Sequence, residues 1–121
     1  MNENYEIKNA VIESAIFDVE RVLSAWLQLD YGDSEHQGFG GYLLYVPEGL
    51  KAHNSNGSYA GHFIWRVLEI AGVDDWARLP GRMIRVKANR SNVAAIGHII
   101  KDDWFDPTKD FEAMLANREG K

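Results

Sequence analysis

The chain has 121 residues, 45% of them hydrophobic, and a formal net charge of −5. This length predicts a single globular domain spanning residues 1–121, with one modest core. The absence of cysteine excludes a disulfide framework and cysteine-ligated zinc, and it is typical of proteins in a reducing cytosol. The first residues are acidic and lack an apolar run, so we expect no signal peptide, no membrane association and a cytoplasmic location.

The charge is distributed unevenly along the chain. Residues 1–50 hold two Lys or Arg against nine Asp or Glu, whereas residues 51–121 hold a small excess of Lys and Arg. No acid occurs between Asp75 and Lys101, a stretch that contains Arg78, Arg82, Arg85, Lys87 and Arg90. A locally basic stretch on an acidic protein favours a small anionic ligand over nucleic acid, because duplex-binding proteins usually carry a basic domain or stripe. The alternative is a hairpin with ordinary surface cations.

The first half of the chain predicts three strands. Residues 5–19 are rich in Ile, Val and Phe and predict a long first strand. Residues 22–31 alternate between apolar and polar side chains, which predicts a second strand. We expect a loop over 32–35 and, after a glycine-rich segment, a third strand over 42–46 that ends at Pro47.

The second half predicts two helices with two strands between them. In chain order these are a helix over 59–71, a helical turn within 74–79, strands over 82–88 and 93–101, and a helix from Pro107 with Asp106 as N-cap. Ser58 is the expected N-cap of the first helix, and Gly72 stands where its C-cap belongs. The order βββαββα predicts an α+β domain, with a mainly antiparallel sheet or partial barrel and one main helix packed on it.

A glycine-rich segment, Gln37-Gly38-Phe39-Gly40-Gly41-Tyr42, is the first candidate ligand site. Its glycines allow positive φ and close approach, and successive N–H groups in such a loop can hold a phosphate. Phe39, Tyr42 and the nearby Tyr31 could stack on a base. The segment lacks the strand–turn–helix setting of a dinucleotide fingerprint. The alternative is a structural bulge where a strand bends across the helix.

The second candidate lies on one face of the first predicted helix and consists of His62, Trp65 and Arg66. Trp could stack on an aromatic ligand, Arg could hold a phosphate with its planar group, and His could add a hydrogen bond. Alternatively, Arg66 pairs with Glu69 while Trp65 contacts the sheet, another subunit or a ligand. The basic stretch adds two further candidate ligand-binding residues, Arg82 and Arg85.

Other polar residues give weaker signals. His98 shares a predicted strand face with Ile96 and Ile100, which favours a place in the core. Asp102 and Asp103 could serve a metal ion or an acid–base step, but a polar turn explains them more simply. The 4 histidines lack metal-ligand spacing and no nucleophile motif occurs. We therefore predict no catalytic residue, no metal and no cofactor.

Several separated segments occur in one order: Leu29-Asp30-Tyr31-Gly32, Gln37 to Tyr42, Ala60 to Arg66, Ala95 to Ile99 and Asp103 to Pro107. Together they resemble a family of small proteins widespread in tailed phages and prophages, over about residues 7–111. The resemblance implies a phage accessory protein. It supplies no catalytic residue, because no established reaction comes with the family.

Small phage proteins often counter host defence, and one class binds nucleotide immune signals such as ADP-ribose derivatives. Our leading hypothesis is a protein that sequesters such a signal. This role needs aromatic stacking, phosphate donors and usually an oligomer, as in the sponge groups called Lockin and Sequestin, although no motif assigns the chain to either. We expect the pocket between the segment 37–42 and the helix start at 62–66.

Two alternatives stay open. The acidic first half could serve an interaction protein that inhibits a host defence protein directly, as anti-CRISPR proteins do. A phosphodiesterase that cleaves such signals could use His62 or His98 as acid or base. Trp65, Trp76 and Trp104 are more aromatic surface than one small core needs, and they predict a homo-oligomer.

Overall fold

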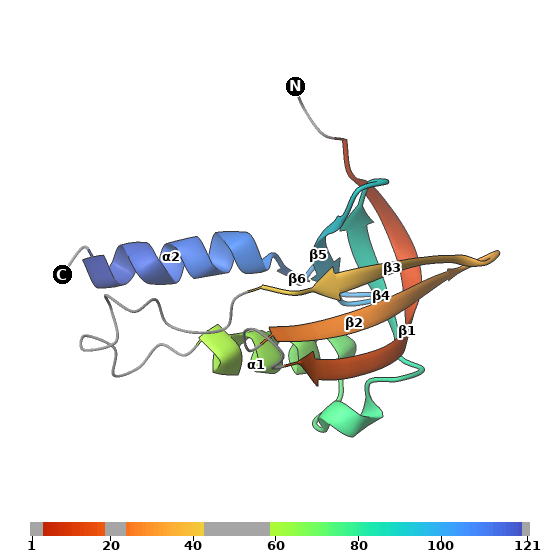
Figure 1. Cartoon of the computed structure of the whole chain (residues 1–121), viewed down its shortest axis with the longest axis horizontal. Helices are drawn as coiled ribbons and strands as arrows, with labels where there is room; N and C mark the ends of the chain where they lie inside the picture. Colours follow the sequence, from red (N-terminus) through yellow and green to blue (C-terminus); the bar gives the residue numbers. More distant parts are fainter. Residues whose placement is uncertain (1–3, 19–23, 43–58, 120–121) are drawn as a thin grey trace.

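The computed structural model describes residues 4–18, 24–42 and 59–119 (Figure 1). Six strands form one antiparallel sheet in the order β3-β2-β1-β4-β5-β6. The elements are β1 (Glu6–Asp18), β2 (Ser24–Gly32), β3 (Glu35–Gly40), α1 (Tyr59–Ala71), the 3-10 helix η2 (Trp76–Arg78), β4 (Met83–Ala88), β5 (Val93–Gly97), β6 (Trp104–Phe105) and α2 (Pro107–Glu119). The sheet is open at β3 and β6, and the predicted α+β class is confirmed.

β1 belongs to both halves of the sheet. Its first residues pair with β4 and its last residues pair with β2, and Val11 takes part in both ladders. The register with β2 shifts between Ile12 and Ser14, which makes Glu13 the extra residue of a β-bulge. Bulges bend a strand, and Figure 1 shows β1 curving from one half of the sheet to the other.

The third strand lies earlier in the chain than the sequence predicts. β3 begins at Glu35, whereas the predicted strand covers 42–46, most of which lies outside the described residues. The cause is a two-residue turn in which Asp33 and Ser34 both adopt positive φ, 54° and 66°. This geometry closes a tight hairpin, so pairing resumes at once, with Gly32 opposite Glu35.

The strand predicted over 93–101 ends earlier than the sequence predicts. β5 ends at Gly97, and the two-residue strand β6 pairs with it after a turn. His98 therefore lies in this turn and not on a strand face with Ile96 and Ile100, as the sequence predicts. Its Nδ1 accepts the main-chain N–H groups of Ile100 and Lys101, each at 3.0 Å. The His98 side chain thereby provides an acceptor for two main-chain N–H groups that no strand ladder pairs.

Two helix boundaries lie where the sequence predicts them. Gly72 follows α1 with a φ of +74°, and its N–H donates to the main-chain oxygen of Leu68 at 2.9 Å, as in a left-handed C-cap. Asp106 precedes α2, and its Oδ1 accepts the N–H of Lys109 at 3.2 Å, so it is the N-cap. Ser58 lies outside the described residues. No helix in the described ranges is long and apolar enough to cross a membrane.

The core lies between α1 and one face of the sheet. The helix contributes Phe63, Val67 and Ile70, all buried, at the spacing of a single apolar face. Phe39 and Phe105 meet Phe63 from the two open edges of the sheet, with ring centroids 5.9 and 5.6 Å away. Burial of each such ring stabilises the fold by about 1.5–3 kcal/mol. α2 extends away from the sheet (Figure 1).

Candidate functional site

A groove of about 660 Å³ lies between β1, the β2–β3 hairpin and the β4–β5 turn; we call it the hairpin groove. Small-molecule sites commonly occupy about 300–1,000 Å³, so its size suits a nucleotide-sized compound. Its lining residues are Asn4, Glu6, Lys8, Tyr31, Ser34, Glu35, His36, Gln37, Asn89 and Arg90.

Strand alternation places two of these side chains in the groove. Tyr31 follows Leu29 on β2, and Gln37 precedes Phe39 on β3, each at a spacing of two residues. Leu29 and Phe39 are buried in the core, so the same sheet face becomes polar towards the hairpin. The groove is thus a polar continuation of the core face.

Gln37 links the two sides of the groove. Its Nε2 donates to the main-chain oxygen of Asn89 at 2.9 Å and lies 3.4 Å from that of Arg90. Its Oε1 accepts the hydroxyl of Tyr31 at 2.5 Å. The amide thereby fixes the Tyr31 ring and holds the β4–β5 turn beside β3, where no strand pairing does so.

Tyr31 presents a neutral phenol in the groove. Burial, and then the negative charge of Glu35, raise its pKa to about 12. The Lys8 ammonium lies 4.9 Å from the centroid of the Tyr31 ring, within the range of a cation–π contact. The ring and the cation together form a surface that suits an aromatic group carrying negative charge.

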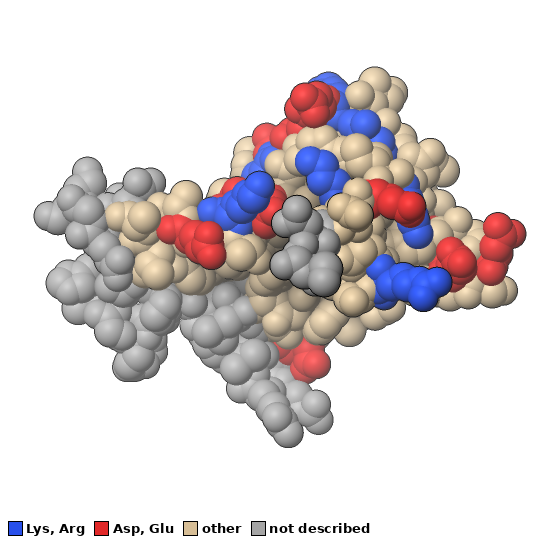
Figure 2. Space-filling view, turned by 90° about the horizontal axis from the view of Figure 1, so that it is seen from above, with Lys and Arg blue, Asp and Glu red and all other residues tan. Residues whose placement is uncertain are grey.

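The groove holds charges of both signs. Lys8 lies 4.0 Å from Glu6, and both side chains are exposed, so their pairing is weak. Arg90 is exposed and forms no ion pair within the described residues. Its guanidinium therefore has hydrogen-bond donors available for an anion. Figure 2 shows blue and red side chains interspersed over one face of the molecule, without a continuous basic stripe on the described residues in view.

The predicted site residues fall in several places. Tyr31 and Gln37 meet in the hairpin groove. A second hollow, of about 360 Å³, is lined by Gln37, Gly38, Gly40, Gly41 and Tyr42 together with Trp26 and the β4–β5 turn. The sequence predicts a pocket between 37–42 and 62–66; among the described residues there, the rings of Phe39 and Tyr42 both contact Phe63.

The glycine segment accommodates Trp26. Gly40 and Gly41 have φ of +134° and +76°, which disfavour any side chain. A Cβ at Gly40 would lie 2.0 Å from the main-chain oxygen of Ala25, and one at Gly41 would lie 2.3 Å from Cζ2 of Trp26. The segment from Gln37 to Gly40 thus lies close to β2 in continuous register, and the ladder has no bulge within it, unlike the bulge alternative. Phe39 within it is only 1% exposed.

The helix residues make structural contacts. Arg66 donates from Nη2 to Asp103 Oδ1 at 2.8 Å and to the Trp104 oxygen at 2.9 Å, and its Nη1 pairs with Glu69. The hydrogen bond from Arg66 holds the pKa of Asp103 below its usual value. Trp65, by contrast, is 62% exposed. Arg66 thus joins α1 to β6, while Trp65 keeps an open surface.

His62 and the two other arginines also have partners in the fold. His62 Nε2 lies 2.7 Å from Asp110 Oδ2 and joins α1 to α2. Arg82 donates from Nε to the main-chain oxygen of Ala71 at 3.1 Å, at the end of α1. Arg85 donates to the main-chain oxygens of His98 and Lys101 at 2.8 and 2.7 Å. None of these three side chains lines the hairpin groove.

Lys8 and Asn89 are not among the residues that the sequence predicts to bind a ligand, and Arg90 is predicted only as a member of the basic stretch. The signal for Lys8 is its place on the core-facing side of β1, two residues before buried Ala10. No sequence signal places Asn89 and Arg90, since the β4–β5 turn reaches β3 only through the curvature of the whole sheet.

No protein-family model matches the chain. No curated protein and no solved structure matches it either. The resemblance to a phage family stays a prediction, and a functional proposal has to rest on the residues of the hairpin groove.

Proposed function

We propose that the protein binds a small anionic ligand with an aromatic ring, of the nucleotide type, in the hairpin groove. The observation that carries the proposal is the meeting of the Tyr31 ring with two cationic side chains, Lys8 and Arg90, in one groove of about 660 Å³. An aromatic face and a planar guanidinium are the groups that bind a base and a phosphate.

Each group has a separate part in the proposed complex. The Tyr31 ring, held by Gln37, stacks on the base, and Lys8 reinforces the contact from beside the ring. Arg90 has no ion pair within the described residues, so it can form a bidentate contact with phosphate without breaking an existing pair. The acids Glu6 and Glu35 select against a highly charged polyphosphate and favour a ligand with few negative charges.

Binding without turnover suits this groove better than phosphodiester cleavage. His62 and His98, the two residues that the sequence offers as acid or base, do not line the groove. His62 is held by Asp110, and His98 Nδ1 accepts the N–H groups of Ile100 and Lys101. Within the proposal, the protein sequesters its ligand, as a phage protein acting against a host immune signal would. This wider setting, and the homo-oligomer that goes with it, rest on the sequence resemblance and on the exposed Trp65.

A thermal-shift screen tests the proposal. The panel contains AMP, cyclic AMP, ADP-ribose and cyclic ADP-ribose, with ribose and inorganic phosphate as partial ligands. A compound at one hundred times its dissociation constant stabilises the folded state by about 2.7 kcal/mol. We expect stabilisation by at least one nucleotide and by neither partial ligand. Equal melting temperatures with and without every nucleotide would contradict the proposal.

A further inference from the structure

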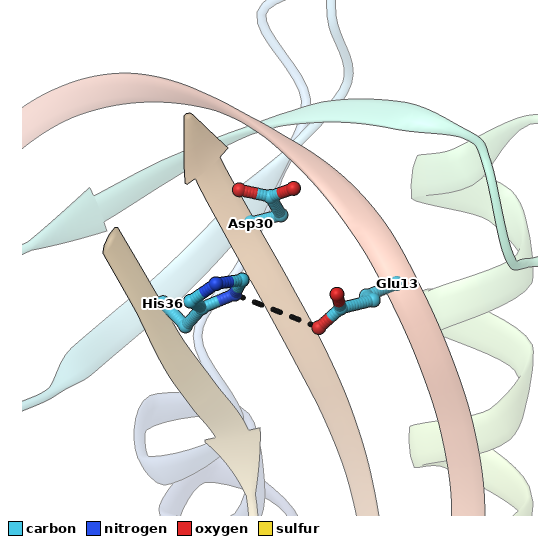
Figure 3. Close-up of side chains that lie close together, drawn as sticks. All are labelled: Glu13, Asp30 and His36. Atoms are coloured by element: carbon cyan, nitrogen blue, oxygen red, sulfur yellow. Dashed lines mark ion pairs between the residues drawn. The ribbon is translucent and has the colours of Figure 1, made fainter. Parts of the chain in front are cut away.

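Three side chains that bind metals elsewhere in proteins meet on the outer face of the sheet. They are Glu13 on β1, Asp30 on β2 and His36 on β3, and their ligand atoms all lie within 4.8 Å of one another. Figure 3 shows them on three adjacent strands, with the Glu13 carboxylate directed across β2 towards the His36 ring. We propose that these residues bind a divalent transition metal of the Zn²⁺ type.

The sheet itself creates this arrangement. Asp30 and His36 lie directly opposite each other in the β2–β3 ladder, so their side chains share one face. Glu13 is the extra residue of the β1 bulge and has no partner on β2. Bulges commonly redirect a side chain, and this one leaves the carboxylate free to extend over the neighbouring strand. The three ligands therefore come from paired strands rather than from a loop.

The separation between two of the ligand atoms suits a single ion. His36 Nδ1 lies 3.5 Å from Glu13 Oε1. Two ligands of one tetrahedral zinc ion, each about 2.0–2.1 Å from the metal, are separated by about 3.4 Å. Asp30 Oδ1 accepts the N–H of Gly32 at 2.8 Å, which orients the carboxylate and leaves its second oxygen for the metal.

The donor set indicates the class of metal. One imidazole nitrogen with two carboxylate oxygens suits Zn²⁺ and similar transition ions, whereas Mg²⁺ and Ca²⁺ prefer oxygen ligands alone. Two carboxylates close together repel each other, and a cation between them removes that repulsion. The side chains of Glu13 and His36 are 54% and 46% exposed, so we expect micromolar rather than nanomolar affinity, with water completing the coordination.

The proposal does not rest on nucleotide binding. His36 also lines the hairpin groove, but the other two ligands do not. A titration with the metal alone therefore distinguishes the two proposals, because it can succeed or fail whatever the nucleotide panel shows.

The experiment is calorimetric titration of the metal-free full chain with ZnCl₂, supported by absorption spectra with Co²⁺. We expect one zinc per chain, with at least a tenfold loss of affinity in His36→Asn and in Glu13→Gln. Glu35→Gln is the matched control, since Glu35 adjoins His36 but does not belong to the cluster, and it should bind zinc as the wild type does. Circular dichroism verifies that each variant is folded.

Histidine NMR signals give a second readout that does not depend on the variants. Zinc should shift the His36 imidazole resonances in the wild type and leave those of His98 in place. No binding by the wild type, unchanged affinity in folded His36→Asn, or a zinc-dependent shift at His98 instead of His36 would each overturn the proposal.

Discussion

Gln37 on β3 donates from Nε2 to the main-chain oxygen of Asn89, 2.9 Å away and 52 residues later in the chain. β3 and the β4–β5 turn are not joined by strand pairing, so this side-chain hydrogen bond connects them instead. It gives the hairpin groove its second wall and, through Tyr31, its aromatic surface.

Replacing Gln37 by Ala should destabilise the protein by about 1 kcal/mol, since one or two partly buried hydrogen bonds are lost. Urea unfolding measures the change. Gln28→Ala removes an exposed amide from the neighbouring strand β2 and should change stability by less than about 0.5 kcal/mol. Equal effects of the two substitutions would show that the Gln37 bridge does not stabilise the fold.

Gly41→Ala should destabilise the protein more than Gly81→Ala. Both glycines have positive φ, which costs an alanine about 1–2 kcal/mol. Only the Gly41 position adds a clash, with Trp26, because nothing lies within 4 Å of a Cβ at Gly81. The difference between the urea midpoints of the two variants therefore measures the destabilisation caused by the clash with Trp26.

Adding Trp26→Ala to Gly41→Ala gives an internal control. The double variant should lose the steric part of the Gly41→Ala effect while keeping the part due to positive φ. A purely additive double variant would mean that the glycine segment does not bend to accommodate Trp26.

The fold could largely be predicted from local patterns, and the site could not. The alternation of apolar and polar residues and the helix caps predict β1, β2, α1 and β4, because each of these patterns lies within a few neighbouring residues. The role of Gly41 depends on Trp26, fifteen residues earlier, and that of Arg66 depends on Asp103, 37 residues later. Such partners are set by strand register and sheet curvature, which single-residue patterns do not record.

Asp103 should make stability depend on pH in the acid range. Arg66 lowers the pKa of Asp103 in the folded state, so the pair stabilises the fold above the ordinary carboxyl pKa. This stabilisation disappears as the pH falls through the lowered pKa. The pair is partly exposed, so we expect less than about 1 kcal/mol.

The measurement compares urea midpoints at pH 7, 5 and 3 for wild type and Asp103→Asn. The variant should be less stable at pH 7, and the gap should narrow at pH 3. Asp74→Asn, at an exposed acid 3.9 Å from Arg78, is the control and should follow the wild type. If the urea midpoints of wild type and Asp103→Asn changed in parallel with pH, the Arg66–Asp103 pair would not contribute to stability.

Phe111→Ala should loosen α2 without unfolding the sheet. Phe111 stacks on Tyr59 of α1 at 4.6 Å between centroids, and the neighbouring His62 and Asp110 form a polar link between the two helices. Hydrogen exchange should therefore become faster in α2 and stay unchanged in β4, whose residues pair on both sides. His62→Ala should give the same pattern to a smaller degree. Uniformly faster exchange would contradict an independent docking of α2.

Calorimetric titration of ADP-ribose into the wild type, Arg90→Ala and Arg78→Ala tests nucleotide binding at the hairpin groove most directly. Arg78 is an exposed arginine on η2 and does not line the groove, so it is the matched control. A hydrogen bond to a charged group contributes about 1.5–3 kcal/mol, which corresponds to a tenfold or greater loss of affinity in Arg90→Ala. We predict that loss in Arg90→Ala and wild-type affinity in Arg78→Ala. Equal affinity of all three proteins, or no heat of binding by the wild type, would contradict a nucleotide site in the hairpin groove.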